Sequence, residues 1–183
     1  IGVPHGTAGS EASVSPHGVD VETEQAVVNL YRSQFEGLFR FAMTITRDRA
    51  LAEDAIQDTF LRYFIALRED HLIRNPPAWL YRVLRNRLLD DRRRSSPEAF
   101  GGDAPQLASN GDSCPEAAFR HEETSADLRA SLTGRELECL QLRVEGLSYR
   151  EIASTLGIRP GTVGALLARA LNKSRQVLEP NGS

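Results

Sequence analysis

Apolar side chains in the first half of the chain recur at steps of three and four residues, the spacing of one face of an α-helix. Three such stripes follow one another, over residues 27–45, 51–67 and 79–88. Asp48 provides an N-cap for the second stripe, and Asn75 caps the third just before a first-turn proline. Because no long stretch alternates apolar and polar residues with period two, this half is predicted to be a lobe of three helices.

The second half of the chain carries sharper helix-start signals. Thr133-x-x-Glu136 and Ser148-x-x-Glu151 are both capping boxes. The expected helices of this lobe are 116–130, 134–145, 149–156 and a long helix after Pro160. The long helix has one inward stripe, which consists of Val163, Leu167, Ala170, Ser174 and Val177.

The spacing of Ala153, Gly157 and Val163 is the most specific local pattern in the sequence. A helix-turn-helix needs a small residue where its helices cross, a glycine to turn the chain, and an apolar anchor on its second helix. The pattern therefore predicts a helix-turn-helix with residues 160–178 as the recognition helix. An ordinary helical hairpin is the alternative.

Two segments lack helical periodicity and are rich in Gly, Ser, Pro and Ala or Asn. Residues 1–22 are predicted to be a disordered tail, and residues 97–118 a flexible linker. The predicted fold is therefore all-α, with two small helical domains at 23–96 and 119–183.

The net charge of −3 hides an uneven distribution along the chain. Residues 25–96 carry thirteen bases and nine acids, and residues 132–183 carry seven bases and five acids. Between them, residues 97–131 hold two bases and seven acids. Of the 22 basic residues, 21 are arginine, which suits phosphate groups and base edges; a GC-rich genome is the alternative explanation of this bias. Two mildly basic blocks are therefore separated by an acidic one.

Several classes of protein are disfavoured by what the sequence lacks. It has no glycine-rich phosphate loop, His-Glu metal motif or nucleophile elbow, so we expect no enzyme, cofactor, metal site or catalytic residue. Cys114 and Cys139 are far apart and form no CxxC motif, which favours a reducing cytoplasm. No apolar run approaches about eighteen residues, and the N-terminus lacks a signal-peptide pattern, so we expect no membrane insertion.

Three stretches, in this order, resemble the motifs of bacterial RNA polymerase sigma factors of the extracytoplasmic-function (ECF) type. They are residues 50–62 (ALAEDAIQDTFLR), residues 77–94 (PAWLYRVLRNRLLDDRRR) and the run from Leu132 to Val163. In the family the first grips core polymerase, the second melts and reads the minus-ten element, and the third reads the minus-thirty-five element. The resemblance implies a sigma factor that directs promoter-specific initiation. Its implied partners are core RNA polymerase and promoter DNA, with an anti-sigma protein as a further candidate.

The resemblance also assigns roles to individual residues. For core polymerase the candidates form an acidic, hydrogen-bonding surface: Glu53, Asp54, Gln57 and Asp58. For the minus-ten element they are His71, Arg74, Asn75, Arg82, Arg85, Asn86 and Arg92, of which the first three lie in a loop that accepts a flipped base. For the minus-thirty-five element they are Tyr149, Arg150, Arg159, Thr162, Leu166, Arg169 and Lys173.

Other roles are open for several of these segments. Arg82, Arg85 and Arg92 share a helix face that tracks phosphates or, alternatively, braces the acids of the preceding helix. Trp79 either stacks on a base or belongs to the core. The acidic linker either threads the RNA channel of polymerase, as in the family, or is a simple spacer.

The recognition helix departs from the family pattern. The run from Gly161 to Leu166 lacks two basic residues, so we expect this lobe to bind DNA weakly alone or to read an unusual element. An apolar patch around Leu166 that binds a protein is the alternative. Two other functions therefore stay open: a stand-alone helix-turn-helix regulator, and a sigma-like adaptor that binds an anti-sigma protein.

Overall fold

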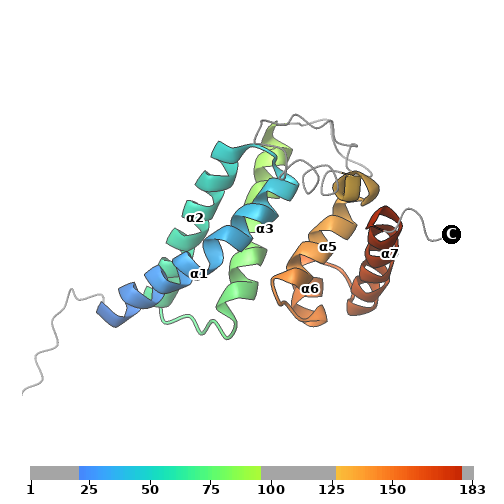
Figure 1. Ribbon diagram of the computed structural model, residues 1–183. Helices are drawn as coiled ribbons and strands as arrows, with labels where there is room; N and C mark the ends of the chain where they lie inside the picture. The colour runs from blue at the N-terminus through green and yellow to red at the C-terminus, as the bar shows by residue number, and fades with distance from the viewer. Residues whose placement is uncertain (1–20, 96–126, 179–183) are drawn as a thin grey trace, which may run out of the picture.

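The computed structural model describes residues 21–95 and 127–178, and these form two helical lobes (Figure 1). The first lobe consists of α1 (Val21–Ile45), α2 (Arg49–Arg68) and α3 (Pro76–Ser95). The second consists of α5 (Gly134–Val144), α6 (Tyr149–Leu156) and α7 (Pro160–Leu178). The described residues contain no β-strand, and the predicted all-α, two-lobed fold is confirmed.

Polar caps and tight turns define the three helices of the first lobe. The carboxylate of Asp48 accepts hydrogen bonds from the first backbone N–H groups of α2, and the side-chain oxygen of Asn75 accepts one at the start of α3. Arg47 and Asp70 adopt positive φ angles of 58° and 55° in the connections that flank α2. These signals are local, which is why the sequence predicted where α2 and α3 begin.

The second lobe is a helix-turn-helix, as predicted. Both capping boxes are formed, with Thr133 and Ser148 as N-caps. Gly157 ends α6 with φ of 67°, the left-handed conformation that glycine adopts without steric cost. Ala153 and Val163 are buried where α6 and α7 meet. Helix α7 packs on α5 and α6 and lies on the side away from the first lobe (Figure 1).

The two lobes pack directly against each other. Helix α3 contacts α6, and α1 contacts α5. The buried apolar side chains of both lobes form one continuous cluster, which extends from Leu38 and Leu84 in the first lobe to Leu142 and Ile152 in the second. The helical patterns predicted each lobe separately but did not predict this packing.

A few expected boundaries differ or fall outside the described residues. The expected tail ended at residue 22, and α1 begins at Val21. Residues 127–131 are helical and agree with the end of the helix expected over 116–130. The remainder of that helix, residues 1–20, Cys114 and the linker expected over 97–118 lie outside the described residues.

Candidate nucleic-acid and polymerase interfaces

The acidic residues of α2 form a surface that is partly neutralised by arginines. Glu53 pairs with Arg49 one helical turn earlier, at 2.8 Å. Asp54 and Asp58 both face Arg87 of α3, at 3.6 and 3.2 Å. The side chain of Asp54 is still 69% exposed, and Gln57 beside it is exposed as well. This surface therefore presents hydrogen-bond acceptors to solvent, while ion pairs join its inner edge to α3.

Arg87 is a residue whose structural role the sequence did not reveal. Besides the two pairs to α2, its guanidinium contacts Asp91 one turn later in α3. We expected arginines of α3 either to track phosphates or to brace the acids of α2, and considered Arg82, Arg85 and Arg92. Arg87 holds the acids of α2 instead, through its ion pairs with Asp54 and Asp58.

The loop between α2 and α3 lines a cavity of about 470 Å³. The candidate minus-ten residues His71, Arg74, Asn75 and Arg82 all contribute to its wall. The opposite wall comes from α6 of the second lobe and includes Glu151, Ser154 and Thr155. The structure thus brings together four of the seven candidate minus-ten residues, and all four stay exposed although α6 forms the opposite wall of the cavity.

Trp79 packs on the core with one side and lines the cavity with the other. Its ring lies 5.7 Å from the ring of Tyr63, which is buried in the core of the first lobe. Trp79 also lines the cavity beside the loop. The indole is therefore a fixed, half-buried wall of the cavity, since core packing holds one side of it.

The expectation that Arg82, Arg85 and Arg92 share an accessible face is wrong for Arg85. Arg82, Arg92 and the nearby Asn86 are exposed, whereas Arg85 is 6% exposed. Its Nε donates to the carboxylate of Glu138 in α5 at 2.7 Å, and both side chains of this ion pair are nearly buried. The helical step placed Arg85 correctly on the helix, but the packing of the second lobe covers that face.

The candidate minus-thirty-five residues divide into exposed and buried positions. The exposed ones are Tyr149, Arg150, Arg159, Thr162 and Arg169. Leu166 was expected to face outward and does not: it is 8% exposed and belongs to the apolar cluster. The proposed apolar patch for a protein partner around Leu166 is therefore wrong, because the side chain is part of the core.

Glu136 is an ionised group beneath the recognition helix. Lys173 donates to its carboxylate at 2.7 Å, and Arg169 lies 3.8 Å from it. Burial by itself raises the pKa of Glu136, but hydrogen bonds from Lys173 and from the Thr133 cap lower it below the ordinary value. Lys173 is thus engaged within the lobe, while the side chain of the neighbouring Arg169 is more exposed, at 61% against 36%.

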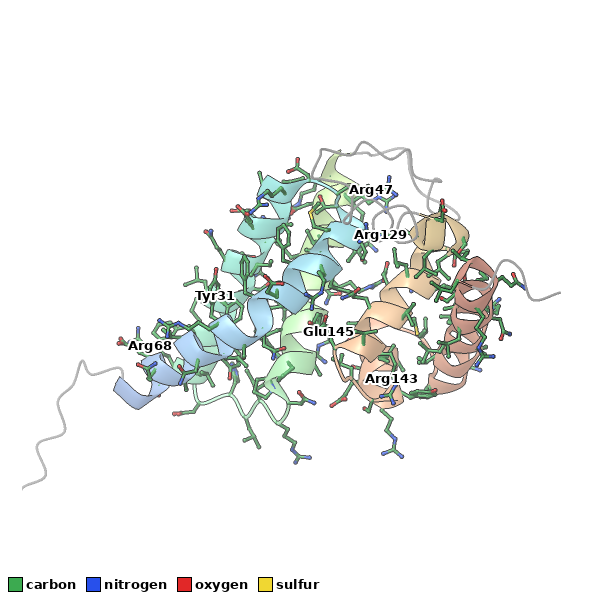
Figure 2. All side chains as sticks on the ribbon, in the orientation of Figure 1. Tyr31, Arg47, Arg68, Arg129, Arg143 and Glu145 are labelled. Carbon is green, nitrogen blue, oxygen red and sulfur yellow. The ribbon has the colours of Figure 1, made fainter. Side chains whose placement is uncertain are left out.

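Glu151 and Tyr81 are two further groups whose pKa values are shifted, and both lie between the lobes. Hydrogen bonds from Ser148, and from Asn75 across the interface, lower the pKa of Glu151. Burial, followed by the charge of Glu145, raises the pKa of Tyr81. Glu145 lies on the side of α5 that faces α1 (Figure 2), and Arg40 of α1 donates to it at 3.0 Å.

The described part of the chain holds no cluster of three or more His, Cys, Asp or Glu side chains that suits a metal ion. None of the helices described is both long and apolar enough to cross a membrane.

An acidic helix surface, an arginine-rich helix beside a loop cavity, and a helix-turn-helix define a two-lobed protein of the sigma-70 class. Residues 30–98 match the model of the family described as "Sigma-70 region 2", and residues 127–173 match that of "Sigma-70, region 4". The chain is 30% identical to the ECF RNA polymerase sigma factor SigE of Mycolicibacterium smegmatis, over 94% of this chain and 72% of that one. It is 32% identical to SigL of Mycobacterium tuberculosis, over 84% and 89% of the two chains. The chain belongs to the ECF sigma factor family.

Solved structures show the same fold. The sigma factor RpoE of Bartonella quintana, determined in complex with the anti-sigma factor NepR, aligns with a TM-score of 0.59 at 22% identity, over 86% of this chain and 97% of that one. CnrH in complex with the cytosolic domain of CnrY aligns with a TM-score of 0.58 at 23% identity, over 87% and 91%.

Proposed function

We propose that this sigma factor binds core RNA polymerase through α2 and reads the two promoter elements with separate lobes. The loop before α3 and the exposed part of α3 bind the minus-ten element, and α6 and α7 bind the minus-thirty-five element. The observation that carries this assignment is the convergence of His71, Arg74, Asn75 and Arg82 around one cavity, with Trp79 as its aromatic wall. The chemistry of RNA synthesis belongs to the polymerase, and the sigma factor acts with it in the cytoplasm.

The exposed acceptors of α2 support the polymerase-binding role. Asp54 and Gln57 project from the helix surface without being covered by the second lobe. An Asp54→Lys variant is expected to lose most of its association with core polymerase in a pull-down at low salt. The control is Glu24→Lys, which makes the same charge change at an exposed position of α1. Equal retention of both variants would contradict the assignment of α2.

The minus-ten role follows from the groups around the cavity. A base flipped out of duplex DNA needs edge contacts and a stacking surface, which Asn75, His71 and Trp79 provide. His71→Ala and Asn75→Ala are expected to change the preference among minus-ten sequences in an open-complex assay with core polymerase. Arg32→Ala, at an exposed site on α1, is the control. If both loop variants keep the preference of the parent protein among minus-ten sequences, the loop does not take part in minus-ten recognition.

The minus-thirty-five role rests on the exposed residues of the helix-turn-helix. Gly164 stands where the family pattern has a basic residue, and a Cβ added there would lie 3.8 Å from the ring of Tyr149, an ordinary contact. Gly164→Arg is therefore expected to add a phosphate contact, with a salt dependence of duplex binding that is steeper by about one unit of slope. Gly164→Ala is the matched control, and the same slope in both variants would contradict the placement of α7 on DNA.

An anti-sigma protein is the further partner that we propose. Both solved structures named above contain an anti-sigma factor or the cytosolic domain of a partner protein. The fold of this chain is similar to theirs over both lobes. Co-purification of the tagged chain from its host, followed by mass spectrometry, is expected to recover one such small protein besides the polymerase subunits.

A further inference from the structure

Glu136 lies where the first turn of α5 meets the recognition helix α7. Its side chain is 4% exposed, and both of its carboxylate oxygens face nitrogen atoms. Oε2 accepts from Nζ of Lys173 at 2.7 Å and from the backbone N–H of Thr133 at 2.9 Å. Oε1 lies 3.8 Å from Nε of Arg169. One buried carboxylate therefore contacts two basic residues of α7 at once.

The position of this carboxylate is fixed from the side of α5. The capping box joins Glu136 to Thr133 through hydrogen bonds in both directions. The adjacent Arg135 donates to the carbonyl oxygen of Leu156, at the end of α6, at 3.1 Å. The start of α5 is thus attached to both helices of the helix-turn-helix. A side chain that is held in this way gives firm support to the groups that it contacts.

Lys173 and Arg169 contact the carboxylate in different ways. Lys173 donates to it from its terminal ammonium, whereas Arg169 approaches with Nε, the guanidinium nitrogen nearest its aliphatic stem. Within the described residues, Glu136 is the only ion-pair partner of Arg169. A guanidinium held through Nε still has its two terminal nitrogens, which suit the bidentate contact that arginine makes with O6 and N7 of guanine.

Arg169 also has a particular place along α7. The segment 160–168 contains no basic residue, so Arg169 is the first basic residue of the recognition helix. It shares a helix face with the exposed residues Thr162 and Ala165, at steps of three and four. These two residues offer a hydroxyl and a methyl group. A strong preference for guanine on this face therefore depends on Arg169.

From this arrangement we propose that Glu136 is a positioning residue for base recognition, which orients Arg169 toward one guanine of the minus-thirty-five element and retains Lys173 within the lobe. The proposal rests on the proposed minus-thirty-five function of α7. Glu136 is buried and does not itself touch DNA. Loss of its charge releases Lys173 toward phosphates while Arg169 loses its support. The base preference of the lobe therefore falls more than its general affinity for DNA.

The test compares the base preferences of holoenzymes assembled from core RNA polymerase and the full chain. The probe is a promoter obtained by run-off transcription on genomic fragments, with its minus-thirty-five element randomised in a pool of duplexes. The duplexes that bind are sequenced. The parent protein is expected to prefer guanine at one position by about five- to 150-fold, the range of one bidentate arginine contact. Arg169→Ala is expected to lose that preference.

Glu136→Gln is the decisive variant, because it removes the charge and keeps the size of the side chain. It is expected to lower the guanine preference at that same position at least about threefold and to leave the preferences at other positions unchanged. Thr133→Ala is the matched control, since it removes the cap of α5 but retains the carboxylate of Glu136. A purely structural role of Glu136 would affect all positions alike, as loss of the cap does. Circular dichroism is expected to show unchanged helix content in both variants.

The double variant separates the positioning role from the underlying function. In an Arg169→Ala background, Glu136→Gln is expected to cause no further loss at the guanine position, because both residues act through one contact. If Glu136→Gln alone keeps the full guanine preference, or lowers the preference at every position equally, the positioning role of Glu136 is overturned while Arg169 remains a DNA-binding residue. If Arg169→Ala has the same base preferences as the parent protein, the minus-thirty-five assignment of Arg169 fails as well.

Discussion

Arg87 of α3 and Asp58 of α2 are joined by an ion pair of 3.2 Å that connects the two helices. The Arg87 side chain is 24% exposed and also contacts Asp54 and Asp91. A single guanidinium therefore holds three carboxylates in place. Removing it leaves the partly buried acids Asp58 and Asp91 without this cation.

The Arg87→Ala variant is accordingly expected to lower the free energy of unfolding by about 1–3 kcal/mol. Arg62→Ala is the matched control, because Arg62 pairs with the same Asp58 at 3.0 Å from a side chain that is 56% exposed. Its loss is expected to cost less than about 1 kcal/mol. Urea denaturation followed by circular dichroism measures both, and equal losses would contradict the role of Arg87.

Gly157 and Gly164 are expected to respond in opposite directions to alanine. Gly157 has φ of 67°, so Gly157→Ala is expected to destabilise the protein by about 1–2 kcal/mol. Gly164 lies within α7, where a Cβ meets only an ordinary contact, so Gly164→Ala is expected to stabilise it by up to about 1 kcal/mol. Thermal unfolding of the two variants checks the sign of each effect.

Cys139 is expected to be inert in the folded protein. Burial raises the pKa of this thiol to about 11, and the side chain is fully buried. In a Cys114→Ser background, the thiol is expected to resist iodoacetamide at pH 8 until denaturant unfolds the second lobe. Rapid alkylation without denaturant would show that α5 separates readily from α7.

Stability of the second lobe is expected to fall in acid because of Glu136. Its pKa is lowered in the folded state, so its contribution is complete above the ordinary value of 4.5 and is lost as pH falls through the folded value. At pH 7 we expect Glu136→Gln to be less stable than the parent by about 1–2 kcal/mol. Denaturation at several pH values between 7 and 3 should show this difference shrinking, and a constant difference would contradict it.

The sequence alone determined the helices, their caps and the helix-turn-helix. Asp48, Thr133 and Ser148 cap their helices through atoms within three residues, and Gly157 turns the chain by its own conformational freedom. These interactions are local, so a linear pattern contains all of the information that they need. The motifs that indicated an ECF sigma factor are likewise runs of neighbouring residues.

Only the tertiary structure decided which face of each helix is covered. Helical spacing placed Arg85 and Leu166 among the DNA-facing residues, yet Arg85 is covered by α5 and Leu166 lies in the core. Arg87 gained its role from α2, and Asn75 gained a partner in Glu151, 76 positions away in the chain. The physical reason is that burial and ion pairing depend on which distant segment packs against a helix, and helical periodicity within one segment does not encode that choice.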